Sequence, residues 1–166
     1  MVAAMAISEQ DLTHLRACVE LAREAFDAGD DPFGSVLVDA AGAVLRTDRN
    51  RAGSGDETQH PEFELARWSA RLPPDERAGC TVYTSGEHCP MCSAAHAWMG
   101  LGRIVYAGSS EQLSQWRASW GLPAGPVAVL PINTVAPGLP VDGPAPELEE
   151  ELRALHRAAY ARSLRR

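Results

Sequence analysis

Two cysteines three residues apart, Cys89 and Cys92, stand within "TSGEHCPMCSAAHAW" at residues 84–98. Thiols at this spacing can form a redox pair, bind a metal ion or fill a hydrophobic core. The stretch follows a β-branched segment and opens a helical pattern, so both sulfurs should lie in the first turn of a helix. Residues three apart share a helix face, and the partial positive charge at a helix N-terminus favours thiolates. Both sulfurs could therefore bind one ion.

A matching ligand precedes the cysteines, because His60 in "QHPEFELA" begins another helical pattern, with Glu62 two residues later. One imidazole nitrogen and two thiolates leave the fourth tetrahedral position of Zn²⁺ open, which is typical of catalytic zinc sites. A thioredoxin-like redox pair is the first alternative, and a structural role for His60 is the second. The other two cysteines, Cys18 and Cys80, are expected to be small buried hydrophobic residues.

The two motifs together support a resemblance to a known family. His60-Pro61-Glu62, followed by Glu87-His88-Cys89-Pro90-Met91-Cys92, resembles the His-x-Glu and Cys-x-x-Cys signature of the cytidine-deaminase-like zinc hydrolases. The similarity runs from "DPFGSVLV" through "DETQHPE" to "RIVYAG" and covers about residues 8–110. "YTSGEHCPMC" is most similar to the branch that contains bacterial guanine deaminases and tRNA adenosine deaminases.

The resemblance implies a role for several residues. His60, Cys89 and Cys92 would hold Zn²⁺, and Glu62 would be the catalytic proton shuttle and not a ligand. Asn50 aligns with an asparagine that contacts the base in relatives, but a loop-opening asparagine is an equal alternative. Phe33 is predicted to wall the base pocket, with a place in the hydrophobic core as its alternative.

Two residues depart from the pattern of the relatives and are predicted to lie near the substrate. His88 replaces a common proline, and it could support the ligands, contact the substrate, serve as a fourth zinc ligand or be a tolerated exposed residue. Pro61 replaces a small residue whose backbone N–H can donate to the base. Proline suits the first turn of a helix but has no N–H. A hydrogen-bond acceptor of the base that faced Pro61 would be left unpaired, which would cost about 1–3 kcal/mol of binding free energy.

The elements that must position these residues follow from hydrophobic periodicity and turn signals. The pattern predicts helices from Ser8 to about Gly29, from Pro61 to about Leu72, after Cys89, over "SEQLSQWRAS" and over about 147–163, with "PPDERAG" as a break. It predicts strands in the hairpin "SVLVDAAGAVLRTDR", in "CTVYTS", in "RIVYAG" and, within the loop-rich segment 121–146, in "VAVLPI". The strands around residues 81–107 should be parallel. We therefore expect an α/β fold, a three-layer α/β/α sandwich around a central mixed five-stranded sheet, in one domain over residues 1–166.

Composition narrows the function classes. The chain has 166 residues, 45% of them hydrophobic, and the N-terminal "MVAAMAISEQ" does not read as a signal peptide. No run approaches the ~18 apolar residues of a membrane span, so we expect a cytoplasmic protein. A formal charge of −7 argues against a nucleic-acid partner. The basic tail suits the end of a helix after four glutamates; it comprises Arg153, Arg157, Arg162, Arg165 and Arg166.

The leading functional hypothesis is a zinc-dependent aminohydrolase of a small amino-substituted heterocycle, a nucleobase or nucleoside, with guanine as the first guess. Adenosine in tRNA is the alternative substrate. A non-catalytic, zinc-stabilised binding module is the alternative of another class, and Glu62 argues against it because a purely structural site needs no unliganded carboxylate. The resemblance also implies a homodimer.

Overall fold

The structure, a computed structural model, describes residues 6–165, and its centre is a mixed sheet of five strands. The strands are β1 (Gly34–Val38), β2 (Val44–Arg49), β3 (Thr81–Gly86), β4 (Ile104–Gly108) and β5 (Val141–Asp142), in the order β2-β1-β3-β4-β5. β1 pairs antiparallel with β2 and β3, whereas β3–β4 and β4–β5 are parallel. The predicted α/β class, the mixed sheet and the parallel pair around residues 81–107 are thus confirmed.

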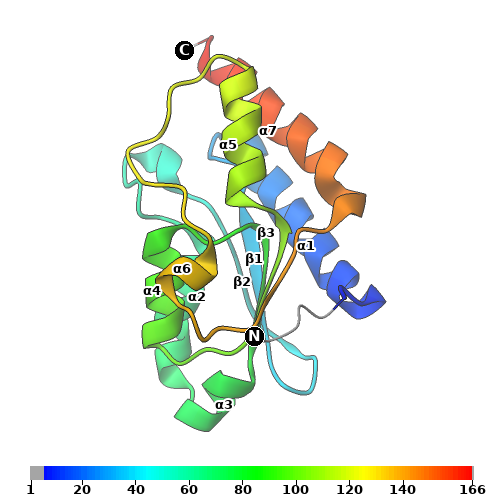
Figure 1. Cartoon of the computed structure of the whole chain (residues 1–166), viewed down its shortest axis with the longest axis vertical. Coiled ribbons are helices and arrows are strands. Elements are labelled where there is room, and N and C mark those ends of the chain that lie inside the picture. The colour runs from blue at the N-terminus through cyan, green and yellow to red at the C-terminus, as the bar shows by residue number, and fades with distance from the viewer. Residues whose placement is uncertain (1–5, 166) are drawn as a thin grey trace.

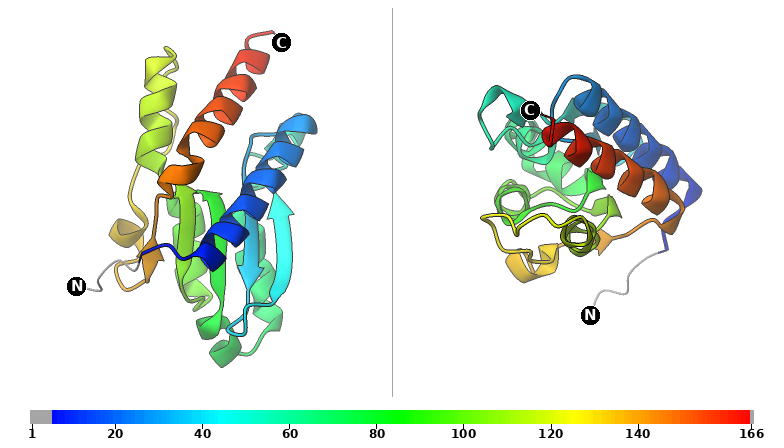
Figure 2. Two further views of the ribbon diagram at one scale, coloured as in Figure 1. Left: turned by 90° about the vertical axis from the view of Figure 1, so that its right-hand side faces the viewer. Right: turned by 90° about the horizontal axis from the view of Figure 1, so that it is seen from above.

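Helices cover both faces of this sheet (Figures 1 and 2). They are α1 (Glu9–Asp27), α2 (Pro61–Trp68), α3 (Pro74–Gly79), α4 (Pro90–Trp98), α5 (Ser110–Ser119), α6 (Ile132–Val135) and α7 (Glu149–Ser163), with short 3₁₀ turns at 52–54, 69–71 and 146–148. α1 packs on β1 and β3 and is joined by α7, whereas α2 packs on β1 and β2 and against α4. The chain is therefore layered α/β/α, as predicted.

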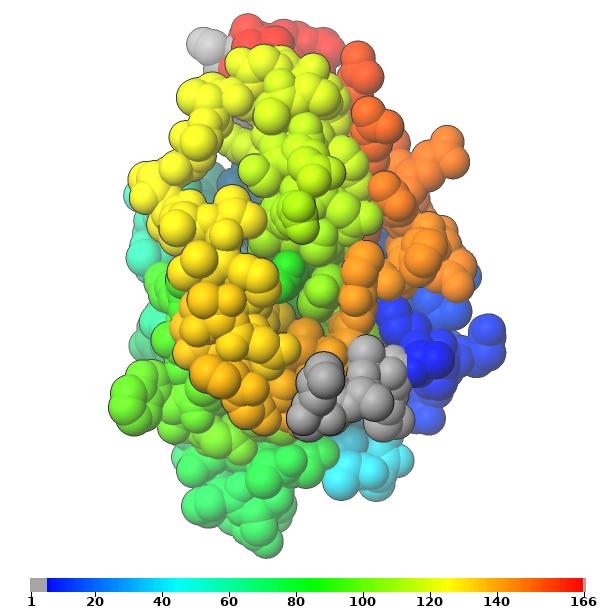
Figure 3. Space-filling view, in the orientation of Figure 1, coloured from blue at the N-terminus to red at the C-terminus, as the bar shows by residue number. Residues whose placement is uncertain are grey.

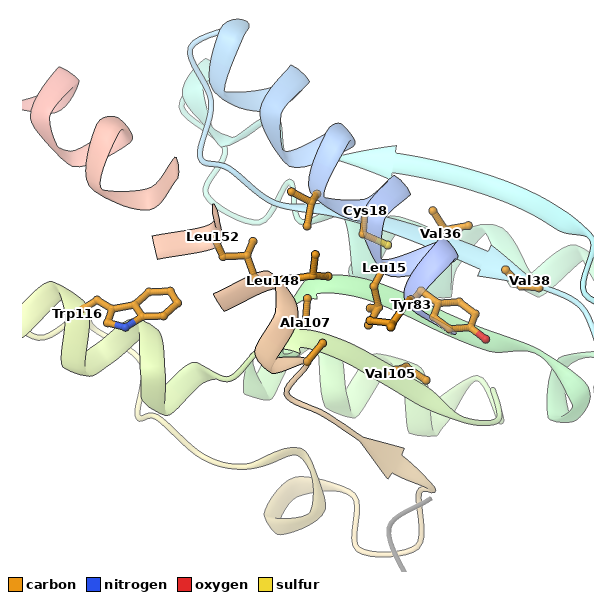
Figure 4. Packing of buried hydrophobic residues seen from close by; sticks show 13 residues of the cluster. Leu15, Cys18, Val36, Val38, Tyr83, Val105, Ala107, Trp116, Leu148 and Leu152 are labelled. Carbon is orange, nitrogen blue, oxygen red and sulfur yellow. The ribbon is translucent and has the colours of Figure 1, made fainter. Parts of the chain in front are cut away.

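The side chains along each strand point alternately to the two faces of the sheet, and they form two separate hydrophobic cores. In β1, which is buried along its whole length, Val36 and Val38 belong to the core under α1, whereas Leu37 belongs to the core under α2 and α4. Figure 4 shows the first of these cores, with Leu15 of α1 near Cys18 and Tyr83, and with Leu152 of α7 near Leu148. Because successive strand residues point to opposite faces, the same strands carry side chains both to the core and to the site described below.

A buried ionic network holds the start of α1 on the sheet. Asp11 completes a capping box with Ser8, and its carboxylate accepts hydrogen bonds from Tyr83 Oη and Arg103 Nη1, both at 2.8 Å. Arg103 Nε also donates to Asp142 of β5 at 2.7 Å. Burial alone would raise the pKa of Asp11, but the hydrogen bonds from Arg103, Ser8 and Tyr83 outweigh it and lower the pKa from 3.8 to about 2. One network thus links α1, β3, β4 and β5.

Two element predictions are wrong. "VAVLPI" at 127–132 forms no strand: residues 127–131 are irregular, α6 begins at Ile132, and the fifth strand is the two-residue β5 at Val141–Asp142. Pro126 precedes the segment and Pro131 lies within it, and proline cannot donate to a strand ladder. "PPDERAG", expected to be only a break, contains the short helix α3, which Pro74 opens at a position that favours proline.

The two ends of the chain differ in how far the structure describes them. The predictions about the N-terminal segment and the basic tail rest partly on residues 1–5 and Arg166, which lie outside the described residues. The C-terminal helix predicted at about 147–163 corresponds to α7. Within residues 6–165, none of the helices has both the length and the apolar character needed to cross a membrane.

Candidate metal centre and active site

His60, Cys89 and Cys92 converge at the start of two helices. His60 is the N-cap of α2, Cys89 is the N-cap of α4, and Cys92 lies in the first turn of α4. His60 Nδ1 lies 3.6 Å from Cys89 Sγ and 3.5 Å from Cys92 Sγ, and all three donor atoms lie within 4.8 Å of one another. Tetrahedral zinc with ordinary bond lengths separates a nitrogen from a sulfur ligand by about 3.6 Å. The donor set and its spacing therefore fit Zn²⁺.

The two thiols differ in pKa, because the hydrogen bond between them favours the thiolate of Cys89, and this bond together with burial raises the pKa of Cys92. A hydrogen bond from Cys92, aided by His60, lowers the pKa of the Cys89 thiol to about 4, against the effect of burial. Metal ligation requires the thiolate, so this thiol is already in the form that binds a cation near neutral pH. The alternative of two cysteines that merely fill a core does not fit, because Cys89 is only half-buried and faces an imidazole.

Glu62, the second residue of α2, lies beside these ligands without joining them. Its Oε1 accepts a hydrogen bond from Thr84 Oγ1 at 2.8 Å and lies 3.3 Å from Ser35 Oγ, while its Oε2 is 3.7 Å from Cys92 Sγ. The side chain is 6% exposed, and burial raises the pKa of Glu62 above its ordinary 4.5, although His60 and Thr84 act in the opposite direction. One oxygen is thus fixed to the sheet and the other points to the metal ligands.

The two hydroxyl partners of Glu62 were not identified from the sequence. Ser35 of β1 and Thr84 of β3 are fully buried, and Ser35 Oγ donates to Thr84 Oγ1 at 2.9 Å. The available signal was their position: both are polar residues in buried strands, on the face opposite Val36 and Tyr83. A buried hydroxyl facing a predicted catalytic helix points to a carboxylate or a similar partner.

Asn50 and Pro61 lie close to the metal ligands in sequence and are both buried. Asn50 Oδ1 accepts a hydrogen bond from the Ala52 N–H at 2.8 Å, and the Asn50 N–H donates to Phe33 O at 3.0 Å. Its side-chain oxygen therefore serves the loop, while its NH₂ group has no hydrogen-bond partner within residues 6–165. Pro61 occupies the first position of α2, directly after His60, as the sequence predicts.

Phe33 and His88 lie outside the cavity beside the metal ligands. Phe33 packs its ring 5.0 Å from that of His156 and lines smaller neighbouring cavities. His88 is 0% exposed, so the alternative of an exposed residue is wrong. Neither His88 ring nitrogen has a hydrogen-bond partner within residues 6–165, and its ring meets that of His96 edge-on at 5.4 Å. Burial, and then His96, lowers the pKa of His88 well below its usual value, which keeps the ring neutral.

A cavity of about 410 Å³ opens beside His60 and Cys89. One face of α5 and the irregular segment 121–130 form its other walls, and Figure 3 shows this segment standing away from α5 with a hollow between them. The sequence predicted α5 as a helix but gave it no role in the site. The sequence feature that could have indicated this role is the spacing of Ser110, Ser114 and Arg117, which places three polar side chains on one helix face.

Glu87, two residues before the first cysteine ligand, holds both ends of that wall. Its Oε2 accepts a hydrogen bond from the Ser110 N–H at 2.9 Å, and its Oε1 accepts one from the Ile132 N–H at 3.1 Å. Its own N–H donates to Gly108 O at 2.8 Å. The starts of α5 and α6 are thereby fixed to the turn that carries Cys89, a link that the motif alone did not reveal.

Comparison with known proteins assigns the family. Residues 8–108 match the family described as the cytidine and deoxycytidylate deaminase zinc-binding region. This chain belongs to that family. The match contains His60, Glu62, Cys89 and Cys92 and confirms the predicted cofactor, Zn²⁺, with His60, Cys89 and Cys92 positioned to bind a metal ion.

The relatives that this chain resembles are named for different substrates. The chain is 38% identical over 107 residues to a probable cytosine deaminase of Schizosaccharomyces pombe (64% of this chain, 65% of that protein). It is 35% identical over 97 residues to a guanine deaminase of Bacillus subtilis (57% and 62%). It is 33% identical over 111 residues to a tRNA-specific adenosine deaminase of Haemophilus influenzae (66% and 64%). The alignments span less than two thirds of each relative.

Solved structures agree on the fold. The guanine deaminase from Nitrosomonas europaea superposes with a TM-score of 0.70 at 21% identity, covering 93% of this chain and 85% of that one. At this identity the likeness concerns the fold alone. It extends beyond the family match at residue 108, so the C-terminal part, with α5 and α7, follows the same architecture.

Proposed function

We propose that this protein is a zinc-dependent hydrolytic deaminase that releases ammonia from a small amino-substituted heterocycle. The observation that carries the proposal is the position of Glu62: a buried carboxylate held by Thr84 at 2.8 Å, beside three metal donors that it does not join. A purely structural zinc site has no use for such a group. The cavity beside His60 and Cys89 offers a place for the substrate.

The proposed chemistry divides the work between the ion and the chain. Zinc, when bound by His60, Cys89 and Cys92, lowers the pKa of water from 15.7 towards ~7 and so provides a nucleophile at neutral pH. Glu62 would take one proton from that water at the carboxylate oxygen nearer the ligands and deliver it to the ring nitrogen. It would then carry a second proton, from the hydroxyl group added to the ring carbon, to the amino group, which leaves as ammonia. The raised pKa of Glu62 suits a group that must hold and release a proton. Thr84 keeps its other oxygen in place throughout.

Free nucleobases are the first substrates to test, with guanine and cytosine at the head of the series. The named activities of the B. subtilis and S. pombe relatives support this order. Asn50, with its unpaired NH₂ group, is proposed to donate to the base, and Pro61 to make the pocket unsuited to a base acceptor on that edge. His88 and Phe33 are proposed to act only through packing, because they lie outside the cavity lining.

Adenosine in tRNA is the second candidate, and the H. influenzae relative favours it. The formal charge of −7 argues against it, because binding to polynucleotides draws on clustered positive charge. We further propose a cytoplasmic homodimer, on the family resemblance alone. Light scattering during gel filtration tests the dimer.

The decisive experiment measures ammonia release by the zinc-loaded protein with a panel of free bases, nucleosides and tRNA. Turnover of a base or nucleoside that is lost in Glu62→Ala supports the proposal. Glu64→Ala serves as the matched control, because Glu64 lies on the same helix and its side chain forms no hydrogen bond within the described residues. A zinc-loaded protein that is inactive on the whole panel would leave the binding-module alternative.

A further inference from the structure

The cavity beside the metal ligands has one charged wall residue, Arg117. Among the described residues that line it, Arg117 is the only charged side chain apart from the ligands, and no acidic residue lines it. The remaining walls are mainly apolar, including Leu113, Leu122 and Val129. A volume of about 410 Å³ lies within the ~300–1,000 Å³ range of pockets that enclose drug-sized ligands. The cavity therefore has room for more than a single heterocyclic ring.

The α5 helix carries polar groups from the metal end of the cavity to this arginine. Ser110 lies at the start of α5, where Glu87 ties it to the turn before Cys89. Ser114 and Arg117 follow four and seven residues later on the same face, so Arg117 lies about 10 Å further along the helix axis. The Ser114 hydroxyl lies between them and has no hydrogen-bond partner within residues 6–165.

The Arg117 guanidinium is free of carboxylate partners in the described part of the chain. Arg49 and Arg103 form ion pairs at 2.8 Å or less, whereas Arg117 forms none, even with Asp31, which lines the adjoining cavity. Burial, and then the charge of Arg117, lowers the pKa of His156 to about 4, so that neighbour is neutral. Arg117 is thus an uncompensated cation above an apolar cavity, in a chain whose formal charge is −7.

We propose that Arg117 forms an anionic subsite, so that the substrate is a small heterocycle bearing a phosphate or carboxylate group that extends along α5 from the metal ligands. This inference rests on the proposed deaminase function. The guanidinium presents parallel N–H donors that match either anion in a bidentate pair, and the Ser114 hydroxyl adds a third donor. Arg117 and Ser114 are both exposed, so an anionic group can reach them from solvent.

The test uses matched substrates that differ only in the anion. Ammonia release is measured for cytosine, cytidine and cytidine 5′-monophosphate, for the guanine series, and for a carboxymethyl derivative of each base. The proteins are the zinc-loaded wild type, Arg117→Ala, Arg117→Lys and the control Arg157→Ala. Arg157 is an exposed arginine of α7 outside the cavity lining.

We expect Arg117→Ala to lower kcat/KM for the anionic compounds by about 10- to 100-fold, as for a lost charge-assisted hydrogen bond, and to change the free base less than about twofold. Arg117→Lys should retain part of the activity, and Arg157→Ala all of it. The phosphate and carboxylate arms identify which anion is recognised. Equal rates in wild type and Arg117→Ala for every anionic compound would overturn the subsite. Faster deamination of an RNA hairpin than of any mononucleotide would also overturn it.

A binding measurement separates this inference from the proposed function. Calorimetry with uridine 5′-monophosphate, against uridine, should show binding of the phosphate compound that weakens in Arg117→Ala and with added salt. If no compound releases ammonia, the deaminase function fails, yet Arg117-dependent binding would still establish the subsite. Equal binding by both proteins would reject it whatever the activity.

Discussion

On the α1 face of the sheet, the Asp11 carboxylate accepts hydrogen bonds from Tyr83 and Arg103, and Arg103 in turn reaches Asp142. On the α2 and α4 face, the donor atoms of His60, Cys89 and Cys92 all lie within 4.8 Å of one another, as ligands of one metal ion would. His88 beside them has two buried ring nitrogens without a partner in the described chain. The Asp11 network satisfies its polar groups with protein atoms alone.

The contrast separates scaffold from site. Buried polar groups are normally paired, and unpaired groups in a native fold gather where function requires them. The Asp11 network can be complete because its task is to hold α1 on β3 and β4. The opposite face must keep donors open for an ion and for a substrate. Substitutions on the α2 and α4 face should therefore affect zinc binding and activity, whereas substitutions in the Asp11 network should affect stability.

The largest effect should follow removal of the two thiolate ligands. Cys89→Ala with Cys92→Ala should abolish zinc binding and ammonia release, because one imidazole cannot retain the ion. The wild type should hold about one zinc per chain by atomic absorption. Cys80→Ala, a buried thiol elsewhere, should keep its zinc. Stoichiometric zinc in the double variant would contradict the site.

Removal of the Glu62 carboxylate should leave zinc content and fold intact but lower turnover by about 10²–10⁴-fold, since general acid–base groups contribute that much. Zinc analysis and ammonia release on the same sample check both halves of the prediction. If the Glu62 variant has an activity within a few-fold of that of the Glu64→Ala control, Glu62 is not the proton shuttle.

On the scaffold face, Asp11→Ala should destabilise the fold by about 3–5 kcal/mol, because it leaves Arg103 partly buried with one carboxylate fewer. Folding lowers the pKa of Asp11 from 3.8 to about 2, so its pH-dependent stabilisation, about 2 kcal/mol, is complete above about pH 4 and is lost as pH falls towards 2. Urea unfolding across that range measures it. Asp11→Asn should remove this pH dependence, and an unchanged profile would count against the network.

Pro61→Ala should restore a backbone donor at the start of α2 while leaving zinc bound. It should raise kcat/KM for a base with an acceptor at that edge, such as guanine, by several-fold relative to the native substrate, the value of one hydrogen bond of roughly 0.5–1.5 kcal/mol. Steady-state kinetics on the base panel decide this. Identical rates in both proteins for every base would show that residue 61 does not face the substrate.

The smallest effect should come from His88→Leu. The substitution removes two unpaired buried nitrogens and keeps a similar volume, so stability should change by less than about 1 kcal/mol, or about 2–4 °C in Tm. Activity should fall no more than a few-fold. A loss of zinc or of most turnover would instead make His88 part of the working site.

The sequence predicted the metal donors better than the pocket. His60, Glu62 and the two cysteines form short motifs at helix starts, where local spacing determines geometry. Asn50 is different, because its oxygen bonds to Ala52, a contact that spacing alone does not define.

The pocket wall depends on contacts between distant residues. The segment 127–131 has a strand-like composition but lines the cavity, and the two-residue β5 obtains its pairing from β4 instead. No local pattern marks Glu87 as the partner of two backbone N–H groups that lie 23 and 45 residues further along the chain.

The Glu87 bridge has a consequence for how such a protein can diversify. One carboxylate holds the starts of α5 and α6, so the intervening chain can change in length and composition while its two anchor points stay fixed beside Cys89. The match to the family ends at residue 108, just before the first anchor at Ser110. Because both ends of this wall are fixed beside Cys89, changes in the segment between them can reshape the cavity without moving the metal ligands.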